Sequence, residues 1–108
     1  MKDKFYKKYR KLTPEIKEDL DKVSNFIIND IGINIFKNCR NKLYPEYRSL
    51  LNSYALRKHI LSPTYLARYY VDNGLKMSHD KIFYSISKFD NYCVDLPELK
   101  NYLNNEQI

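Results

Sequence analysis

The chain has 108 residues, 44% of them hydrophobic and 30% charged, which indicates one folded domain and argues against an intrinsically disordered protein. No apolar run approaches the roughly 18–20 residues that span a membrane, so a transmembrane protein is not expected. The formal net charge of +6 is concentrated in two blocks, residues 1–12 and residues 33–60, each of which carries +5. Clustered positive charge attracts polyanions such as nucleic acid, although the same blocks can also form a solvated face and a solubility tail.

Prolines and glycines divide the chain into predicted helices. Each proline stands where a helix would begin, after a good capping residue in two cases and before an acidic residue in the other two. The four pairs are Thr13-Pro14, Tyr44-Pro45, Ser62-Pro63 and Leu96-Pro97. Gly32 and Gly74 are predicted helix ends, because glycine readily adopts the left-handed conformation that closes a helix. No Asn-Gly or Asp-Gly hairpin turn joins alternating strands.

Apolar residues recur at helical spacing in four segments, which predicts one buried face for each helix. In chain order the faces are Ile16, Leu20, Val23 and Ile27; Tyr47, Leu50, Leu51, Tyr54 and Ala55; Leu66, Tyr69 and Tyr70; and Ile82, Ser85, Ile86, Phe89 and Cys93. A short helix is also predicted over Ile33–Cys39. We therefore expect an all-α domain of five to six helices at residues 13–108, preceded by a basic N-terminal arm at residues 1–12.

The sequence features of an enzyme are missing. Two glycines cannot build a phosphate-cradling loop, and the two histidines and two cysteines have no metal-ligand spacing. Neither His59 nor His79 has a nucleophile motif around it. We expect no catalytic activity, no cofactor and no bound metal. Cys39 and Cys93 lie far apart, which suits a reducing cytoplasm better than a disulfide scaffold.

Residues 61–92 have the order of a helix-turn-helix motif. A capped helix is predicted over Leu61–Asn73, Gly74 opens a connection, and Ser78 can cap a second helix that runs through Tyr92. In such motifs the second helix lies in the major groove of DNA, and the residues of its first turn contact base edges.

The same segment resembles the C-terminal DNA-binding domain of the bacterial replication initiator DnaA. The matching residues are Leu61-Ser62, Leu66-Ala67-Arg68 and His79, followed at the family's spacing by Ile82, Ser85, Lys88 and Phe89. Downstream, DLPELKNYL (95–103) is similar to the start of the family's last helix. Upstream, residues 32–59 look like its first half, with residues 39–42 as its basic loop. The resemblance covers about residues 24–103.

The resemblance implies a protein that binds duplex DNA through three sets of contacts. The set that faces the major groove is Ser78, His79, Asp80 and Lys81. The basic loop, in the minor groove or on phosphates, is Arg40, Asn41 and Lys42. Further phosphate contacts are Arg48, Arg57, Lys58 and Lys76. The plainer alternative for the first set is the capped start of a surface helix, and for the other two it is a solvated basic surface.

The sequence also departs from the family pattern. The family's Thr-Thr after the histidine is Asp80-Lys81, its arginine two residues before the histidine is Met77, and the connection is longer. The family's target sequence is therefore not carried over. The ATPase module that precedes the domain in the family is not among these residues, so we expect a stand-alone relative of the kind carried by phages or mobile elements.

The expected function is sequence-preferring duplex-DNA binding in replication or transcription control. The expected location is the cytoplasm, at the nucleoid, or the host cytoplasm if the protein is viral. The alternative is a protein-interaction module on the same helical fold, which would bind an acidic host replication or transcription protein. A shared positive surface at Arg40, Lys42 and Lys81 favours DNA, and an exposed patch of Tyr and Ile away from it favours a protein partner.

Overall fold

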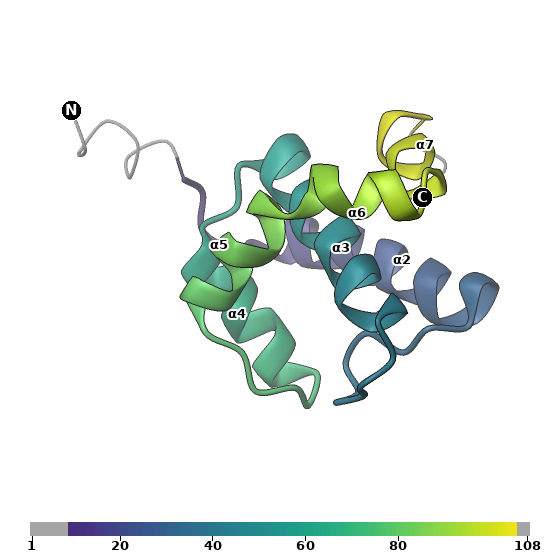
Figure 1. Ribbon diagram of the computed structural model, residues 1–108. Helices are drawn as coiled ribbons and strands as arrows, with labels where there is room; N and C mark the ends of the chain where they lie inside the picture. Colours follow the sequence, from purple (N-terminus) through teal and green to yellow (C-terminus); the bar gives the residue numbers. More distant parts are fainter. Residues whose placement is uncertain (1–8, 106–108) are drawn as a thin grey trace.

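Helix α3 (Leu43–His59) is the centre of the fold in the computed structural model, which describes residues 9–105 (Figure 1). Helices α2 (Pro14–Phe26), α5 (His79–Ser87), α6 (Phe89–Asp95) and α7 (Glu98–Asn105) all pack against it. Nearly every position of α3 from Glu46 to Ala55 is buried, including the polar residues Ser49, Asn52 and Ser53. Because buried polar groups need hydrogen-bond partners, Ser49 and Asn52 become points of attachment for neighbouring helices.

The other helices surround α3. They are α2 (Pro14–Phe26), which continues into a π-helical turn at Ile27–Ile31, α4 (Pro63–Asp72), α5 (His79–Ser87), α6 (Phe89–Asp95) and α7 (Glu98–Asn105). Helix α4 packs against α5, and α6 packs against α5 and α7. Residues 9–105 hold six α-helices and no strand, apart from one isolated bridge between Arg10 and Leu61. The predicted all-α fold of five to six helices is therefore confirmed.

The predicted helix ends and apolar faces also hold for most elements. Thr13 Oγ1 accepts the Ile16 N–H at 3.2 Å and caps α2. Gly32 and Gly74 have φ angles of 88° and 98°, in the left-handed region, just after the π-helical turn that follows α2 and after α4. The predicted faces of α2, α3 and α4 are buried throughout. On the last predicted face the side chains of Ile82 and Phe89 are buried and those of Ser85, Ile86 and Cys93 are half-buried.

The predicted helix over Ile33–Cys39 is wrong, because this segment is a loop that contains one turn. Ile33 and Ile35 are both buried while Asn34 between them is exposed, which is the alternation of an extended chain. Asn34 then makes the turn, since its Oδ1 accepts the Phe36 N–H at 3.1 Å.

The second helix of the predicted helix-turn-helix does not continue to Tyr92, because it divides at Lys88 into α5 and α6. One turn before the break, the backbone carbonyl of Ser85 accepts a hydrogen bond from the hydroxyl of Ser49 on α3 at 2.7 Å. Next to the break, the Ser87 hydroxyl donates to the carbonyl three residues earlier, also at 2.7 Å. Side-chain hydrogen bonds of this kind compete with the helical ladder and bend helices.

The predicted basic arm falls partly outside the described residues, because these begin at residue 9. The residues outside include Lys2, Lys4, Lys7 and Lys8. The Arg10 N–H donates to the Ile60 carbonyl at 2.7 Å, and the Ser62 N–H donates to the Arg10 carbonyl at 2.9 Å. Leu12 packs against the core. The chain therefore joins the helical body at Arg10, ahead of the predicted boundary at residue 12.

Candidate nucleic-acid interface

The first turn of α5 lies on the surface and is held by the cap at Ser78. The Ser78 Oγ accepts the Lys81 N–H at 3.4 Å, so this serine is the helix cap that its position predicted. Ile82 faces inward and is completely buried, whereas His79, Asp80 and Lys81 are exposed. The predicted outward orientation of His79 and Lys81 is therefore confirmed.

His79 and Asp80 form one side of this turn. His79 Nε2 lies 3.2 Å from Asp80 Oδ1, and the two side chains are 56% and 86% exposed. The imidazole also contacts the Phe83 ring edge-to-face at 6.5 Å, and the hollow beside it is bounded by Tyr9 and Pro63. Because so exposed a contact contributes little free energy, both side chains can leave it for another partner.

Lys81 lies on the other side of the turn and lines a groove of about 580 Å³. The groove runs between the α4–α5 connection and the loop that precedes α3. Its lining residues are Asn38, Arg48, Gly74, Leu75, Lys76, Met77, Ser78 and Lys81. None of them is acidic, and neither Lys76 nor Lys81 forms an ion pair with any residue that the structure describes. The groove therefore carries uncompensated positive charge.

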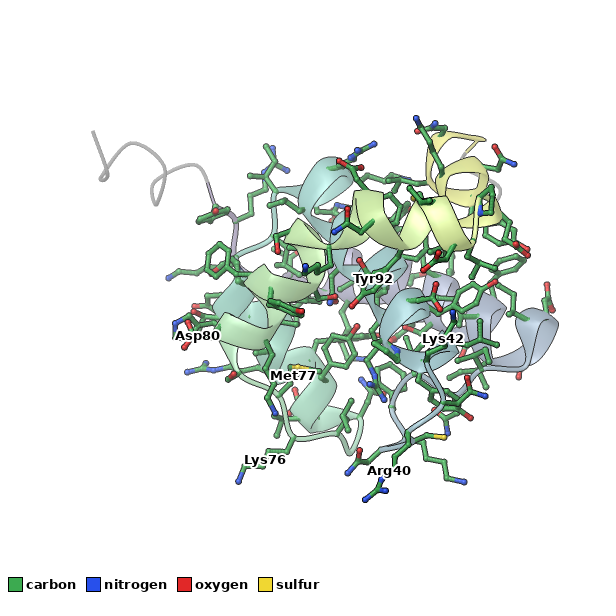
Figure 2. All side chains as sticks on the ribbon, viewed as in Figure 1. Arg40, Lys42, Lys76, Met77, Asp80 and Tyr92 are labelled. Atoms are coloured by element: carbon green, nitrogen blue, oxygen red, sulfur yellow. The ribbon has the colours of Figure 1, made fainter. Side chains whose placement is uncertain are left out.

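The predicted basic loop lies across this groove from the α4–α5 connection. Asn41 Oδ1 accepts the Leu43 N–H at 2.9 Å, which starts α3 two residues earlier than predicted. Arg40 and Lys42 are exposed and have no ion pair within residues 9–105. In Figure 2, Arg40 and Lys76 extend outward along the same edge of the molecule, one from the loop and one from the connection. Two of the predicted contact sets are thus brought together.

Arg48, a predicted phosphate contact, holds the loop in place. Its Nε donates to the Ile35 carbonyl at 2.7 Å, and a second guanidinium nitrogen donates to the Lys37 carbonyl. The guanidinium carbon also lies 6.0 Å from the centre of the Tyr44 ring. Burial lowers the pKa of Arg48, but an arginine keeps its proton at neutral pH. Arg48 therefore adds positive charge to the groove while it anchors the loop.

Arg57 and Lys58 lie near the other end of α3, about 20 Å along its axis from the loop. Lys58 Nζ lies 3.7 Å from Asp19 Oδ2 and 5.3 Å from the centre of the Tyr54 ring. Arg57 lines two hollows beside α6 and α7 and does not line the groove. The structure does not bring this pair together with the other predicted phosphate contacts.

Sequence reasoning missed four residues around α5 and the groove. Asn38 and Met77 line the groove, and nothing in the sequence marks them, because the groove forms between segments far apart in the chain. Phe83 and Tyr84 are exposed aromatic residues on α5. A signal for this pair was present, since both residues fall outside the helical spacing of the buried face that begins at Ile82.

Comparisons with known protein families, with curated proteins and with solved structures give no match to this chain. The resemblance to the DnaA C-terminal domain therefore rests on the residues quoted above and stays a prediction. Within the part of the chain that the structure describes, no three His, Cys, Asp or Glu residues are grouped to hold a metal ion. No described helix combines the length and apolar character needed to cross a bilayer. Cys39 and Cys93 are both free thiols.

Proposed function

We propose that this chain is a non-enzymatic protein that binds duplex DNA with sequence preference and acts in replication or transcription control. The observation that carries the proposal is the exposed, Ser78-capped first turn of α5 beside a groove whose cations have no acidic neighbour in its lining. The order of α4, a connection and α5 is that of a helix-turn-helix, whose second helix enters the major groove. The connection at residues 73–78 is longer than the usual three to four residues.

In this proposal the phosphate contacts are made by the cations in and beside the basic groove. Arg40, Lys76 and Lys81 extend from three separate segments, and each can neutralise a phosphate and release a counterion. Residues 1–8, which lie outside the described residues, carry four further lysines in the sequence. These contacts would give affinity for any duplex and make that affinity strongly dependent on salt.

Base contacts fall to His79 and Asp80. An imidazole N–H can donate to the N7 or O6 acceptors of a purine, and a carboxylate can accept from the amino group of cytosine. Asp80 repels phosphates, so this pair suits a base edge better than the DNA backbone. We therefore expect the sequence preference of the protein to depend on these two residues.

A protein partner is the second candidate function, and the exposed apolar side chains favour it. Phe83 and Tyr84 on α5 are 44% and 61% exposed, and Val94 on α6 is 79% exposed. Phe83 and Tyr84 lie on the same helix as Lys81, and so not away from the basic surface, but exposed aromatic side chains beside positive charge would suit an acidic host protein. Under this alternative the substitution Phe83→Ala weakens binding of the protein partner, and His79→Ala does not change DNA binding.

Selection of bound sequences from a random duplex library tests the proposal. We expect a common sequence to be enriched and to bind more tightly than a scrambled duplex of the same base composition. His79→Ala should reduce the enrichment, whereas Arg57→Ala, which lies outside the groove, should leave it unchanged. If no sequence is enriched and inorganic polyphosphate competes as well as DNA does, the protein-interaction alternative becomes the better account.

A further inference from the structure

An apolar pocket of about 200 Å³ adjoins the basic groove. Its wall includes Pro45, Asn52, Met77, Tyr84, Ser85 and Tyr92. Arg48, Met77 and Lys81 line the groove as well, so the pocket and the groove adjoin along these three side chains, and together we call them the depression. Figure 2 shows Met77 and Tyr92, which come from the α4–α5 connection and from α6. The depression therefore has a cationic part and an apolar part side by side.

Two polar side chains in the pocket wall, Asn52 and Ser85, already have hydrogen-bond partners within the protein. Asn52 Nδ2 donates to Ser85 Oγ at 3.0 Å, and Asn52 Oδ1 accepts from the Tyr70 hydroxyl at 2.8 Å. A bound molecule would therefore contact mainly the rings of Tyr84 and Tyr92, together with Pro45 and the Met77 thioether. Such walls suit a flat, apolar ring and provide little hydrogen-bond selection between different rings.

The charge around the opening is positive. Lys81 and Arg48 stand at the junction of the pocket and the groove, and Lys76 lies further along the groove. Lys88 Nζ lies 5.5 Å from the centre of the Tyr84 ring, which adds a fourth cation. No acidic residue lines either part. The occupant therefore combines a flat ring with negative charge on its neighbouring groups.

We infer that this depression binds an unpaired nucleotide of a single strand, with the base in the apolar pocket and the flanking phosphates on Lys76 and Lys81. A nucleic acid strand carries a phosphate beside every base, which matches an aromatic pocket next to a cationic groove. An aromatic residue of a peptide would fit the pocket too, but it brings negative charge only where an acidic residue happens to be its neighbour.

This site goes beyond duplex recognition by α5. The bases of a duplex are paired and stacked, so a base can enter a pocket of this kind only in a single strand or after it leaves the stack. The pocket would therefore give the protein affinity for locally unpaired DNA, with little preference between bases. The inference rests on the groove and the pocket and does not require His79 to contact bases.

Binding of a short oligothymidylate, compared with an abasic strand of the same length, tests the inference by fluorescence anisotropy. The parent protein should bind the thymidine strand more tightly than the abasic strand. Tyr84→Ala should weaken binding of the thymidine strand by about 5- to 100-fold and leave the abasic strand unaffected. Because the Tyr84 side chain is 61% exposed, its removal should not unfold the protein. Phe83→Ala is the matched control on the same helix, since Phe83 does not line the pocket and should have no effect.

Further binding measurements distinguish a single-strand site from the alternatives. Lys81→Ala should weaken both strands and reduce the dependence of binding on salt, because it removes a phosphate contact. Equal binding of thymidine and abasic strands by the parent, or parent-like binding by Tyr84→Ala, would overturn the inference. Stronger displacement by an acidic peptide containing phenylalanine than by the thymidine strand would overturn it in favour of a peptide site. His79→Ala should leave single-strand binding unchanged, so this inference and the proposed duplex function can fail separately.

Discussion

The hydroxyl of Ser49 donates a 2.7 Å hydrogen bond to the backbone carbonyl of Ser85 and thereby fixes α5 against α3. The Ser85 hydroxyl in turn pairs with Asn52 Nδ2 at 3.0 Å. Both bonds form at a small residue, which allows the two helices to approach closely. The direction in which the first turn of α5 faces is therefore set by buried polar contacts on α3.

Ser49→Ala should destabilise the fold by about 0.5–1.5 kcal/mol, because it removes one hydrogen bond to the Ser85 carbonyl, which also accepts the Lys88 N–H. Ser53→Ala is the matched control, since Ser53 is also buried on α3 but its hydroxyl has no hydrogen-bond partner within the described residues. Its removal should be neutral or slightly stabilising. Urea denaturation of the two variants measures the difference, and an equal loss of stability would contradict the role given to Ser49.

Arg48→Lys should destabilise the fold by about 1–3 kcal/mol, because an ammonium group cannot replace the planar fork that donates to two loop carbonyls. Amide hydrogen exchange should become faster in residues 35–42, and duplex binding should weaken for every sequence. Arg57→Lys, at an exposed position on the same helix, should change neither property. Unchanged exchange in residues 35–42 of Arg48→Lys would show that other contacts hold the loop.

The buried side chain of Glu46 should make the free energy of unfolding fall as pH rises. Its side chain is buried, and neither carboxylate oxygen has a hydrogen-bond partner within residues 9–105. Burial raises the pKa of Glu46 above its ordinary value of 4.5, although the positive charge of Lys42 acts in the opposite direction. The folded state therefore keeps a proton at a pH where the unfolded state has lost it. As a result, the contribution of this group to the free energy of unfolding falls as pH rises from 4.5 through the raised pKa.

Glu46→Gln should remove that fall and increase the free energy of unfolding at pH 7. Glu18→Gln, at an exposed position on α2, is the control and should leave the profile unchanged. Urea denaturation at a series of pH values from acid to neutral measures both. A pH profile of Glu46→Gln that matches the parent would rule out this carboxyl as the cause.

Asp19 should have the opposite dependence on pH. Its Oδ2 accepts the Tyr54 hydroxyl at 2.7 Å and lies 2.6 Å from His59 Nε2. Burial opposes ionisation, but these two bonds and the charge of Lys58 outweigh it and lower the pKa of Asp19. Its stabilisation is therefore present above the ordinary pKa of 3.8 and is lost as pH falls through the lowered pKa. Asp19→Asn should reduce the melting temperature at pH 7 and have little effect below that pKa, whereas a constant penalty at every pH would contradict this account.

The salt dependence of duplex binding should show that the cations beside the groove contact phosphates and that those at the far end of α3 do not. About six phosphate contacts would give a slope of log affinity on log salt near −5, from ~0.9 per contact. Arg40→Ala should reduce this slope by about one, because its side chain extends beside the groove. Arg57→Ala should leave the slope unchanged. Equal slopes for these two variants would show that the groove is not the phosphate-binding surface.

Local signals explain which parts of the fold were predictable from the sequence. Thr13 and Ser78 cap their helices through contacts only three residues away, and the buried faces follow from helical spacing alone. The break at Lys88 could not be predicted in this way, because it lies beside a long-range contact, in which a serine on another helix donates to the Ser85 carbonyl. The loop at 33–42 is likewise held by Arg48 from within α3.

The candidate site, too, was only partly predictable from local sequence signals. The outward direction of His79 and Lys81 follows from the position of Ile82 on the buried face, and it was predicted correctly. The groove was not predictable, because Asn38 and Lys76 come together only through the packing of α3, α4 and α5. The base contacts and the DNA partner stay predictions.

Duplex binding by His79→Ala, measured on the selected sequence and on random duplex at two salt concentrations, tests the central claim most directly. Because the His79 side chain is more than half exposed, the variant should fold like the parent. It should lose ~1–3 kcal/mol of binding free energy on the selected sequence and much less on random duplex, since a base contact discriminates between sequences. Lys81→Ala should also weaken binding to the selected sequence. If both variants bind both duplexes like the parent, α5 does not read DNA and the account is contradicted.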